Sequence, residues 1–248
     1  EIFRYQSINN PIYKAYLEAL KVNPLSIQSI KDIPFLPIGF FKSHSVKTTA
    51  FVPAVIFESS GTTGSISSSH LVKDLLLYEE SFTNGFELFY GSIKKYCIIG
   101  LLPSYLERQH SSLVYMVDKL TQISEHPKSG FYLYDHEKLF TVLNELEKGN
   151  QKALLIGVTF ALLDFADRYS LPLNHTIIME TGGMKGRREE MIRDEVHEKL
   201  CRRFEVNHIH SEYGMTELLS QAYLKGNGIF NCSPWMKIMV SDDEDPFL

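Results

Sequence analysis

The chain has 248 residues, of which 44% are hydrophobic and 22% are charged, a composition typical of a globular protein with a full-sized core. It excludes disordered, collagen-like and fibrous proteins. The 25 lysines and arginines against 30 aspartates and glutamates give a net charge of −5. The small basic cluster Lys185, Arg187 and Arg188 is too short for a duplex-binding surface, so we expect no nucleic acid partner.

The cysteines and the hydropathy pattern indicate the cellular compartment in which the protein is expected. Cys97, Cys201 and Cys232 are an odd number and widely spaced, which favours a reducing environment over a disulfide-stapled scaffold. The longest apolar stretch, residues 153–163, is too short to cross a bilayer, and no charged-then-apolar leader opens the chain. The sequence therefore predicts a cytoplasmic protein without a membrane span.

The N-terminal third mixes several kinds of local pattern. Apolar residues at helical spacing predict a helix over residues 11–22. Residues 33–42 contain two prolines and are expected to be extended. Residues 52–57 form a short β-type run that leads directly into a loop rich in glycine and hydroxyl residues.

From residue 75 onward, helices and strands are expected to alternate. The expected helices cover residues 75–90, 110–120, 136–148, 160–169 and 188–204. The expected strands cover residues 96–102, 131–134, 153–158, 175–179 and 206–209. Strands that are continuous apolar runs between helices are typical of a parallel sheet covered on both faces. The predicted fold class is therefore α/β, with layered, mostly parallel sheets flanked by helices.

The first chemical signal is the loop after the expected strand 52–57. Two glycines let its backbone turn tightly and approach a ligand, and its hydroxyls can donate hydrogen bonds to phosphate oxygens. A solvated serine- and glycine-rich linker is the alternative. The loop is neither a Walker A motif nor a hydrolase nucleophile elbow, because both signatures are missing. Its residues are Ser59, Ser60, Gly61, Thr62, Thr63, Gly64 and Ser65.

The second signal lies between the expected strand 175–179 and the long helix after it. Gly182, Gly183 and Met184 stand where open α/β sheets bind ligands, and glycines there let a flat ring approach the bare backbone. A structural turn with a glycine bend is the alternative.

The third signal follows the expected strand 206–209. Tyr213 offers an aromatic face next to Gly214, Thr216 a hydroxyl and Glu217 a carboxylate for a divalent cation. A nucleotide needs a ring site, a phosphate site and a metal at converging loops. Three such loops at strand ends therefore predict a nucleotide-binding site.

These loops resemble the successive core motifs of the adenylate-forming (ANL) superfamily of acyl- and aryl-CoA synthetases, luciferases and adenylation domains. Longer phrases at residues 35–42, 102–108, 179–187, 210–219 and 235–237 resemble the LuxE-type acyl-protein synthetases, also called long-chain-fatty-acid–luciferin-component ligases. The resemblance spans residue 33 to the end. The core motifs are Ser60-Gly61-Thr62-Thr63-Gly64, Gly182-Gly183-Met184 and Tyr213-Gly214-Met215-Thr216-Glu217.

The resemblance implies that residues 1–248 are the large N-terminal, nucleotide- and acyl-binding domain of such an enzyme. The ribose-binding aspartate and the small C-terminal domain with its catalytic lysine would come after Leu248, so we expect the sequence to be truncated there. The acceptor cysteine of the luminescence enzymes would also lie beyond this point. Cys232 is then expected to be a packed thiol rather than an acyl carrier.

The resemblance also implies a reaction, that of an AMP-forming acid–thiol ligase. A carboxylic acid, here a fatty acid, would attack the α-phosphate of ATP, and the acyl group would then pass to a protein thiol. A relative that acylates coenzyme A or a carrier protein is the first alternative. A non-catalytic nucleotide-binding module is the second. Neither the acid nor the oligomeric state follows from the sequence.

Carried over position by position, the motifs imply individual roles. Residues 59–65 would hold the β- and γ-phosphates, and residues 182–184 would line the adenine and acyl sites. Tyr213 would stack on adenine. Thr216 and Glu217 would be the two catalytic residues: Thr216 would contact the α-phosphate, and Glu217 would bind Mg²⁺. Many superfamily members have a lysine after the first loop, but this chain has none there. His70, Lys73, Lys185 and Arg187 are the candidates for the missing positive charge.

Overall fold

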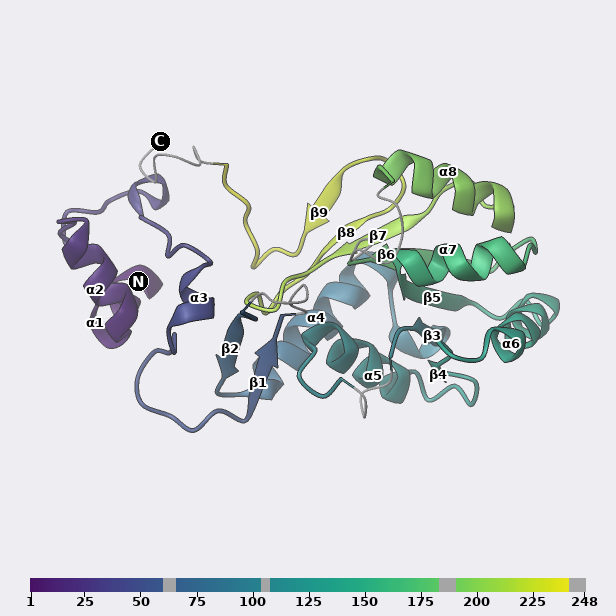
Figure 1. The fold of residues 1–248 in the computed structure, drawn as a ribbon, viewed down its shortest axis with the longest axis horizontal. Coiled ribbons are helices and arrows are strands. Elements are labelled where there is room, and N and C mark those ends of the chain that lie inside the picture. Colours follow the sequence, from purple (N-terminus) through teal and green to yellow (C-terminus); the bar gives the residue numbers. More distant parts are fainter. Residues whose placement is uncertain (60–65, 104–107, 183–190, 241–248) are drawn as a thin grey trace. The chain divides into compact units, whose positions relative to one another are not determined.

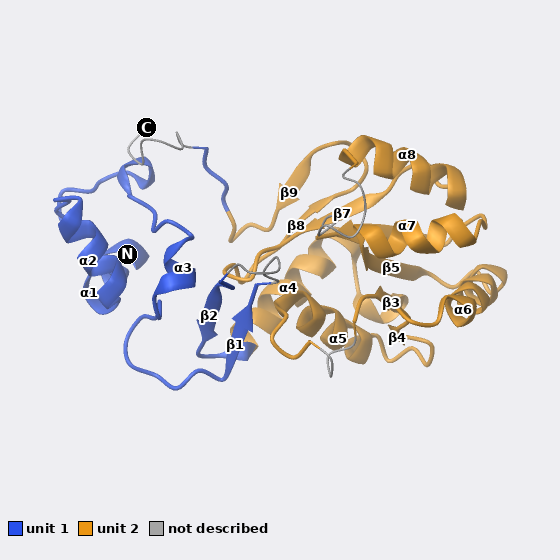
Figure 2. Ribbon diagram, viewed as in Figure 1, with its two compact units in different colours: residues 1–75, 237–248 blue, residues 76–236 orange. Residues whose placement is uncertain are grey.

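The computed structural model describes residues 1–59, 66–103, 108–182 and 191–240 (Figure 1). The chain divides into two compact units, one of residues Glu1–Leu75 and Lys237–Leu248 and the other of Leu76–Met236 (Figure 2). We call these unit 1 and unit 2. The assignment of residues 1–248 to one adenylate-forming N-terminal domain stays a prediction.

Unit 1 consists of short elements. It contains α1 (Ile2–Asn9), α2 (Pro11–Ala19), the 3₁₀ helix η1 (Ile30–Asp32), α3 (Phe40–Ser43) and an antiparallel hairpin of β1 (Val55–Glu58) and β2 (Ser69–Val72). The Asn10 side chain caps α2 by accepting a hydrogen bond from the Tyr13 amide at 3.2 Å. The helix expected over residues 11–22 is present as α2 but ends at Ala19. The segment 33–42, which was expected to be extended, ends in α3.

Unit 2 contains the main sheet and its helices, and it begins within α4. The helices are α4 (Leu75–Tyr90), the 3₁₀ helix η2 (Ile93–Lys95), α5 (Ser112–Ser124), α6 (His136–Lys148), α7 (Thr159–Arg168) and α8 (Arg193–Phe204). The strands are β3 (Cys97–Leu101), β4 (Gly130–Phe131), β5 (Ala153–Val158), β6 (Thr176–Thr181), β7 (His210–Tyr213), β8 (Ala222–Leu224) and β9 (Phe230–Cys232).

The described strands of unit 2 form one seven-stranded sheet in the order β4-β3-β5-β6-β7-β8-β9. The first five strands of this order are parallel, β8 is antiparallel to β7, and β9 is antiparallel to β8. All residues of the central strands β3 and β5 are buried, as expected of a parallel sheet covered on both faces. The predicted α/β class with a mostly parallel sheet is confirmed.

The direction of each crossover decides which face a helix covers. Right-handed connections place α6, α7 and α8 on one face of the sheet and α5 on the other, because β3-α5-β4 runs in the opposite direction along the strand order (Figure 1). Ring contacts support this arrangement: His136 of α6 meets Phe165 of α7, and Tyr78 of α4 stacks on Tyr115 of α5. The sheet is therefore the middle layer of three.

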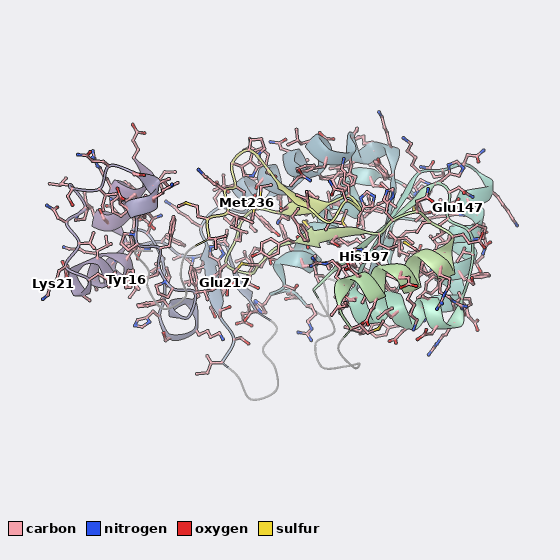
Figure 3. The ribbon with its side chains drawn as sticks, turned by 90° about the horizontal axis from the view of Figure 1, so that it is seen from above. Tyr16, Lys21, Glu147, His197, Glu217 and Met236 are labelled. Carbon is pink, nitrogen blue, oxygen red and sulfur yellow. The ribbon has the colours of Figure 1, made fainter. Side chains whose placement is uncertain are left out.

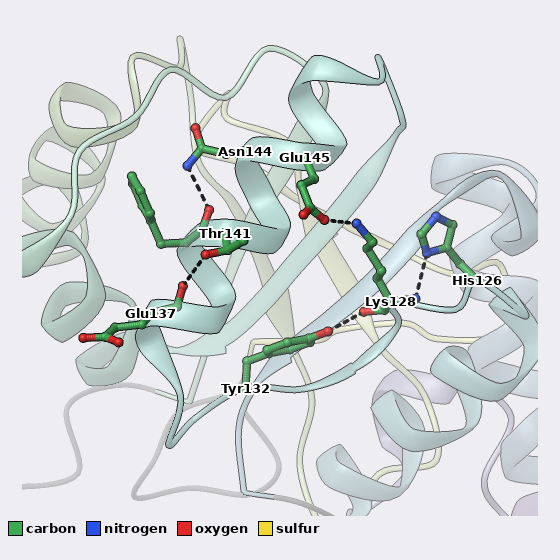
Figure 4. Close-up of polar contacts among 8 residues, drawn as sticks. His126, Lys128, Tyr132, Glu137, Thr141, Asn144 and Glu145 are labelled. Carbon is green, nitrogen blue, oxygen red and sulfur yellow. Dashed lines mark hydrogen bonds and ion pairs between the residues drawn. The ribbon is translucent and has the colours of Figure 1, made fainter.

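Local contacts fix α6 against the loop before β4. The side chain of Asp135 caps the helix by accepting from the Lys138 amide at 2.9 Å. Lys128 forms an ion pair with Glu145 of α6, and the Tyr132 hydroxyl donates to the Lys128 carbonyl at 2.8 Å (Figure 4). These contacts, together with the buried apolar face of α6, explain why its predicted bounds, 136–148, are those observed.

The close packing of β5 gives a first testable expectation. A Cβ atom at Gly157 would lie 2.9 Å from Leu162 Cγ and 3.0 Å from Leu101 Cβ. The Gly157→Ala variant should therefore lower the free energy of unfolding by about 1–3 kcal/mol, the usual cost of overpacking, in urea denaturation. Gly149→Ala is the matched control, since its Cβ would meet nothing closer than 3.4 Å. Equal stability of both variants would contradict the packing of this strand.

Candidate functional site

Two of the three predicted loops leave the same edge of the sheet. β6 ends at Thr181 and is followed by Gly182, whose φ of 75° is a left-handed conformation that favours glycine. β7 is its parallel neighbour and ends at Tyr213, followed by Gly214. Because carboxyl ends of parallel strands meet at one edge, the two loops begin next to each other, where open α/β sheets bind ligands.

Figure 3 shows this edge and the opposite one. Glu217, in the loop after β7, lies at one end of unit 2, and Glu147 lies at the other end, where the strands begin. The Glu147 carboxylate accepts hydrogen bonds from the amides of Asn174 and His175 and from the Thr176 hydroxyl just before and at the start of β6. The amino end of β6 is thus held by structural contacts.

The position of β7 corrects the sequence prediction. A strand was expected over 206–209, but the strand is His210–Tyr213, so Ser211, Glu212 and Tyr213 are part of it. The apolar pattern misled because Ser211 and Glu212 are buried polar residues, whose burial depends on partners from distant parts of the chain.

A polar cluster surrounds Glu180 on the face covered by α7 and α8. Thr159 donates a hydrogen bond to one carboxylate oxygen at 3.0 Å, and Arg193 Nε and His197 Nε2 lie 3.4 and 3.6 Å from the other. Burial by itself would raise the pKa of Glu180. Hydrogen bonds from His197, Ser211 and Thr159 and the charge of Arg193 outweigh it, so that its pKa lies below the ordinary value.

The cluster contains a serine, a histidine and a glutamate but not a hydrolytic relay. His197 Nε2 is the atom that faces both Ser211 Oγ, at 3.4 Å, and Glu180, at 3.6 Å. A relay needs one ring nitrogen for the acid and the other for the nucleophile. The geometry therefore speaks for a structural and electrostatic role of this cluster.

Glu212 occupies the opposite face of the sheet. Its carboxylate accepts a hydrogen bond from the Thr181 hydroxyl at 2.6 Å. A Cβ atom at Gly214 would lie 2.5 Å from Glu212 Oε1, so the carboxylate lies against the backbone where the loop after β7 begins. Burial raises the pKa of Glu212 to about 7; the Thr181 hydrogen bond opposes this rise and the charge of Glu180 adds to it. A buried acid thus links the two loops.

The side chains after β7 differ in exposure. The ring of Tyr213 is 39% exposed, and its hydroxyl is held by a hydrogen bond to Met215 Sδ at 3.2 Å. Thr216 and Glu217 are half-buried in the turn that follows. Tyr213 therefore presents a ring face at the carboxyl edge, as the stacking role requires.

Phe230, which contacts Tyr213, and Arg193, which contacts Phe230, were missed from the sequence. Phe230 of β9 meets the Tyr213 ring edge-on, with 6.1 Å between centroids, and the Arg193 guanidinium lies 5.0 Å from the centroid of Phe230. Phe230 stands in a short strand without an apolar run. Arg193 is one of many charged residues of α8, and such a charge-rich helix is typical of a solvent-exposed face. Neither residue carried a signal of its own.

The described residues that flank the first loop belong to unit 1 and pair as the hairpin of β1 and β2. The Ser59 hydroxyl accepts from the Ser68 amide at 2.9 Å, and the Ser59 amide donates to the Ser68 carbonyl at 3.0 Å. The expected strand before the loop is confirmed as β1, whereas β2 was not predicted. Outside the described residues lie Ser60, Gly61, Thr62, Thr63, Gly64, Ser65, Gly183 and Met184, so their roles stay predictions, as do those of Lys185 and Arg187.

Two features are absent from the described residues. In these parts of the chain, no three His, Cys, Asp or Glu side chains gather as a metal-binding group. Within the same ranges, none of the helices combines the length and the apolar content that a membrane crossing requires. Glu217 as a Mg²⁺ ligand thus stays a prediction.

Comparison with known proteins gives a likeness of fold. The sequence matches no protein-family model and no curated protein sequence. Among solved structures, ATP-bound MatB from Rhodopseudomonas palustris is similar, with a TM-score of 0.51 and 12% identity over 75% of this chain and 34% of that chain. A mutant form of coronafacic acid ligase from Pectobacterium brasiliense aligns with a TM-score of 0.41 and 17% identity, over 61% of this chain and 29% of that chain.

The chain therefore spans only about a third of the length of the solved structures that it matches, 34% and 29%. At 12% identity the likeness to MatB shows a shared α/β fold. What that fold does in this chain depends on the residues at the carboxyl edge of its sheet.

Proposed function

We propose that this chain binds ATP and activates a carboxylic acid as its acyl-adenylate, as an AMP-forming ligase of the adenylate-forming superfamily. One observation carries the proposal: the motif loops at Gly182 and at Tyr213-Gly214 leave adjacent parallel strands at the carboxyl edge of a sheet whose fold is shared with ATP-bound MatB. This edge is where such sheets bind nucleotides.

The proposed reaction has two steps. The carboxylate oxygen of the acid attacks the α-phosphorus of ATP, a new P–O bond forms, and the bond to pyrophosphate breaks. A thiolate then attacks the acyl carbonyl and releases AMP, leaving a thioester. The first step needs charge neutralisation and in-line positioning more than acid–base chemistry.

The residues at the edge fit these ligands. Tyr213 presents a ring for adenine, and Thr216 supplies a hydroxyl near it for the α-phosphate. Mg²⁺ is usually held by one or two carboxylates together with substrate phosphates and water, so the single carboxylate of Glu217 in a half-buried turn suits it. Bound Mg²⁺ would neutralise phosphate charge. Residues 59–65 keep the phosphate-binding role that the sequence predicts.

The test is ATP–pyrophosphate exchange by the full-length protein with a panel of fatty and aryl acids. We expect exchange of labelled pyrophosphate into ATP that depends on Mg²⁺ and on one class of acid, and loss of exchange in Glu217→Ala. Binding of ATP to the chain is measured in parallel by calorimetry. If no acid supports exchange and ATP does not bind, the proposal is wrong. ATP binding without exchange would favour the nucleotide-binding module.

We further propose that the acyl acceptor is a protein thiol, as the LuxE-type phrases imply. The exchange-active acid, radiolabelled, is incubated with ATP and either coenzyme A or a cell extract depleted of small thiols. Label on a protein band that hydroxylamine releases would support the proposal. Formation of acyl-CoA alone would place the chain with the CoA ligases.

A further inference from the structure

Arg193, the first residue of α8, is held in place from two sides. Its Nε lies 3.4 Å from a carboxylate oxygen of Glu180, which is buried at the end of β6. Its guanidinium plane lies over the ring of Phe230, with 5.0 Å from Cζ to the ring centroid. Within the described part of the chain, no other hydrogen bond or ion pair engages its terminal amino groups, and its side chain is 52% exposed.

The same face of the sheet carries the Tyr213 ring. Ser211 is the register partner of Glu180 on β6 and of Leu224 on β8, and Leu224 pairs with Phe230 on β9. Alternate strand residues share a face, so Tyr213 lies on the face of Ser211 and Phe230. The edge contact between the Tyr213 and Phe230 rings agrees with this assignment. Arg193 therefore stands at the same corner of the sheet as the exposed tyrosine.

A guanidinium held in this way is suited to bind an anion. An arginine offers five N–H donors in a rigid plane that matches phosphate oxygens two at a time. The Glu180 and Phe230 contacts orient that plane before any ligand arrives, which reduces the side-chain entropy lost on binding. Because Glu180 lies next to Nε, the fork of terminal amino groups is left for an outside partner.

We propose that Arg193 is a nucleotide-binding residue that contacts a phosphate group of ATP, an inference that rests on the proposed function. It would supply positive charge that the first loop, which lacks a lysine after its glycines, does not. Arg193 was not among the residues expected to do so from the sequence. Its position relative to Tyr213 and Glu180 is what assigns the role.

The experiment compares two ligands and three variants by calorimetry. ATP with Mg²⁺ and adenosine are titrated into wild type, Arg193→Gln, Arg193→Lys and Arg202→Ala. Glutamine keeps much of the length of the side chain over Phe230 but removes its charge, and lysine keeps the charge without the fork. Arg202 lies exposed in the last turn of the same helix, so its variant is the matched control.

We expect Arg193→Gln to weaken ATP binding about 10-fold or more, in line with the usual strength of a charge-assisted hydrogen bond, and to leave adenosine binding unchanged. Arg193→Lys should recover part of the loss, and Arg202→Ala should match wild type. The salt dependence of ATP affinity should be shallower in Arg193→Gln than in wild type.

Four results would overturn the inference. Unchanged ATP affinity in Arg193→Gln would show that the residue does not contact phosphate. An equal loss for ATP and adenosine, or a loss that lysine does not reduce, would assign Arg193 to the support of the aromatic pair. If wild type binds neither ligand, the proposed function fails and the inference fails with it; wild-type ATP binding separates the two cases.

Discussion

Replacing Tyr213 by alanine is expected to weaken ATP binding by about 5- to 150-fold, because a base stacked on an aromatic ring gains on the order of 1–3 kcal/mol. The ring is accessible at the carboxyl edge and is held by Met215 and Phe230 in a fixed orientation. A fixed ring loses little rotamer freedom when adenine arrives, so most of the stacking energy should appear in the affinity. Calorimetric titration with ATP and with adenosine measures it, and both ligands should lose affinity equally.

Two controls define this result. Tyr213→Phe removes only the hydroxyl that contacts Met215 and should retain nearly all of the affinity. Tyr134→Ala removes a more exposed tyrosine, 77% accessible, from the loop before α6 and should have no effect. A loss in Tyr213→Phe as large as in Tyr213→Ala would contradict stacking as the source of affinity.

The second large effect concerns stability and pH. Burial raises the pKa of Glu212 to about 7 from the ordinary value 4.5. Between these values the folded protein holds a proton that the unfolded chain has released, so the free energy of unfolding falls as pH rises through this window. The cost at pH 8 is on the order of 3 kcal/mol relative to pH 4, from 1.36 kcal/mol per pKa unit.

Glu212→Gln should remove this cost while its carbonyl oxygen still accepts from Thr181. We expect the stability of the variant relative to wild type to increase by about 2–3 kcal/mol between pH 5 and pH 8, as measured by urea denaturation at four pH values. Glu198→Gln, at an exposed position of α8, is the control and should run parallel to wild type. Parallel curves for Glu212→Gln as well would show that the Glu212 carboxyl stays charged in the fold.

The local sequence pattern predicts those helices and strands whose own residues show an apolar run or apolar residues at helical spacing. The strand 153–158 is a continuous apolar run, and the helices 75–90 and 136–148 repeat apolar residues at helical spacing; all three were predicted with the observed bounds. The strands β2, β8 and β9 have three or four residues each and are defined by pairing with partners elsewhere in the chain. No local window contains that information.

The candidate site divides in a similar way. Tyr213 ends a strand, Gly182 follows one, and both carry motif signals, so their place at the sheet edge was predicted, although β7 itself was displaced by four residues. Glu212 sits within the same motif, yet its burial against Thr181 depends on the register of two strands. Arg193 and Phe230 meet only because α8 and β9 lie on one face. Such tertiary contacts produce no periodic pattern in the sequence from which they could be predicted.

The change of strand direction between β7 and β8 has a consequence for ligand binding. Tyr213 and Ala222 are ladder partners of β7 and β8, so the loop of residues 214–221, which carries Thr216 and Glu217, is closed at its base by sheet hydrogen bonds. A short loop with fixed ends has little conformational entropy left to lose. The binding edge is therefore preorganised on this side. Inserting flexible residues into the loop should weaken ligand binding, mainly because the longer loop has more conformational entropy to lose on binding.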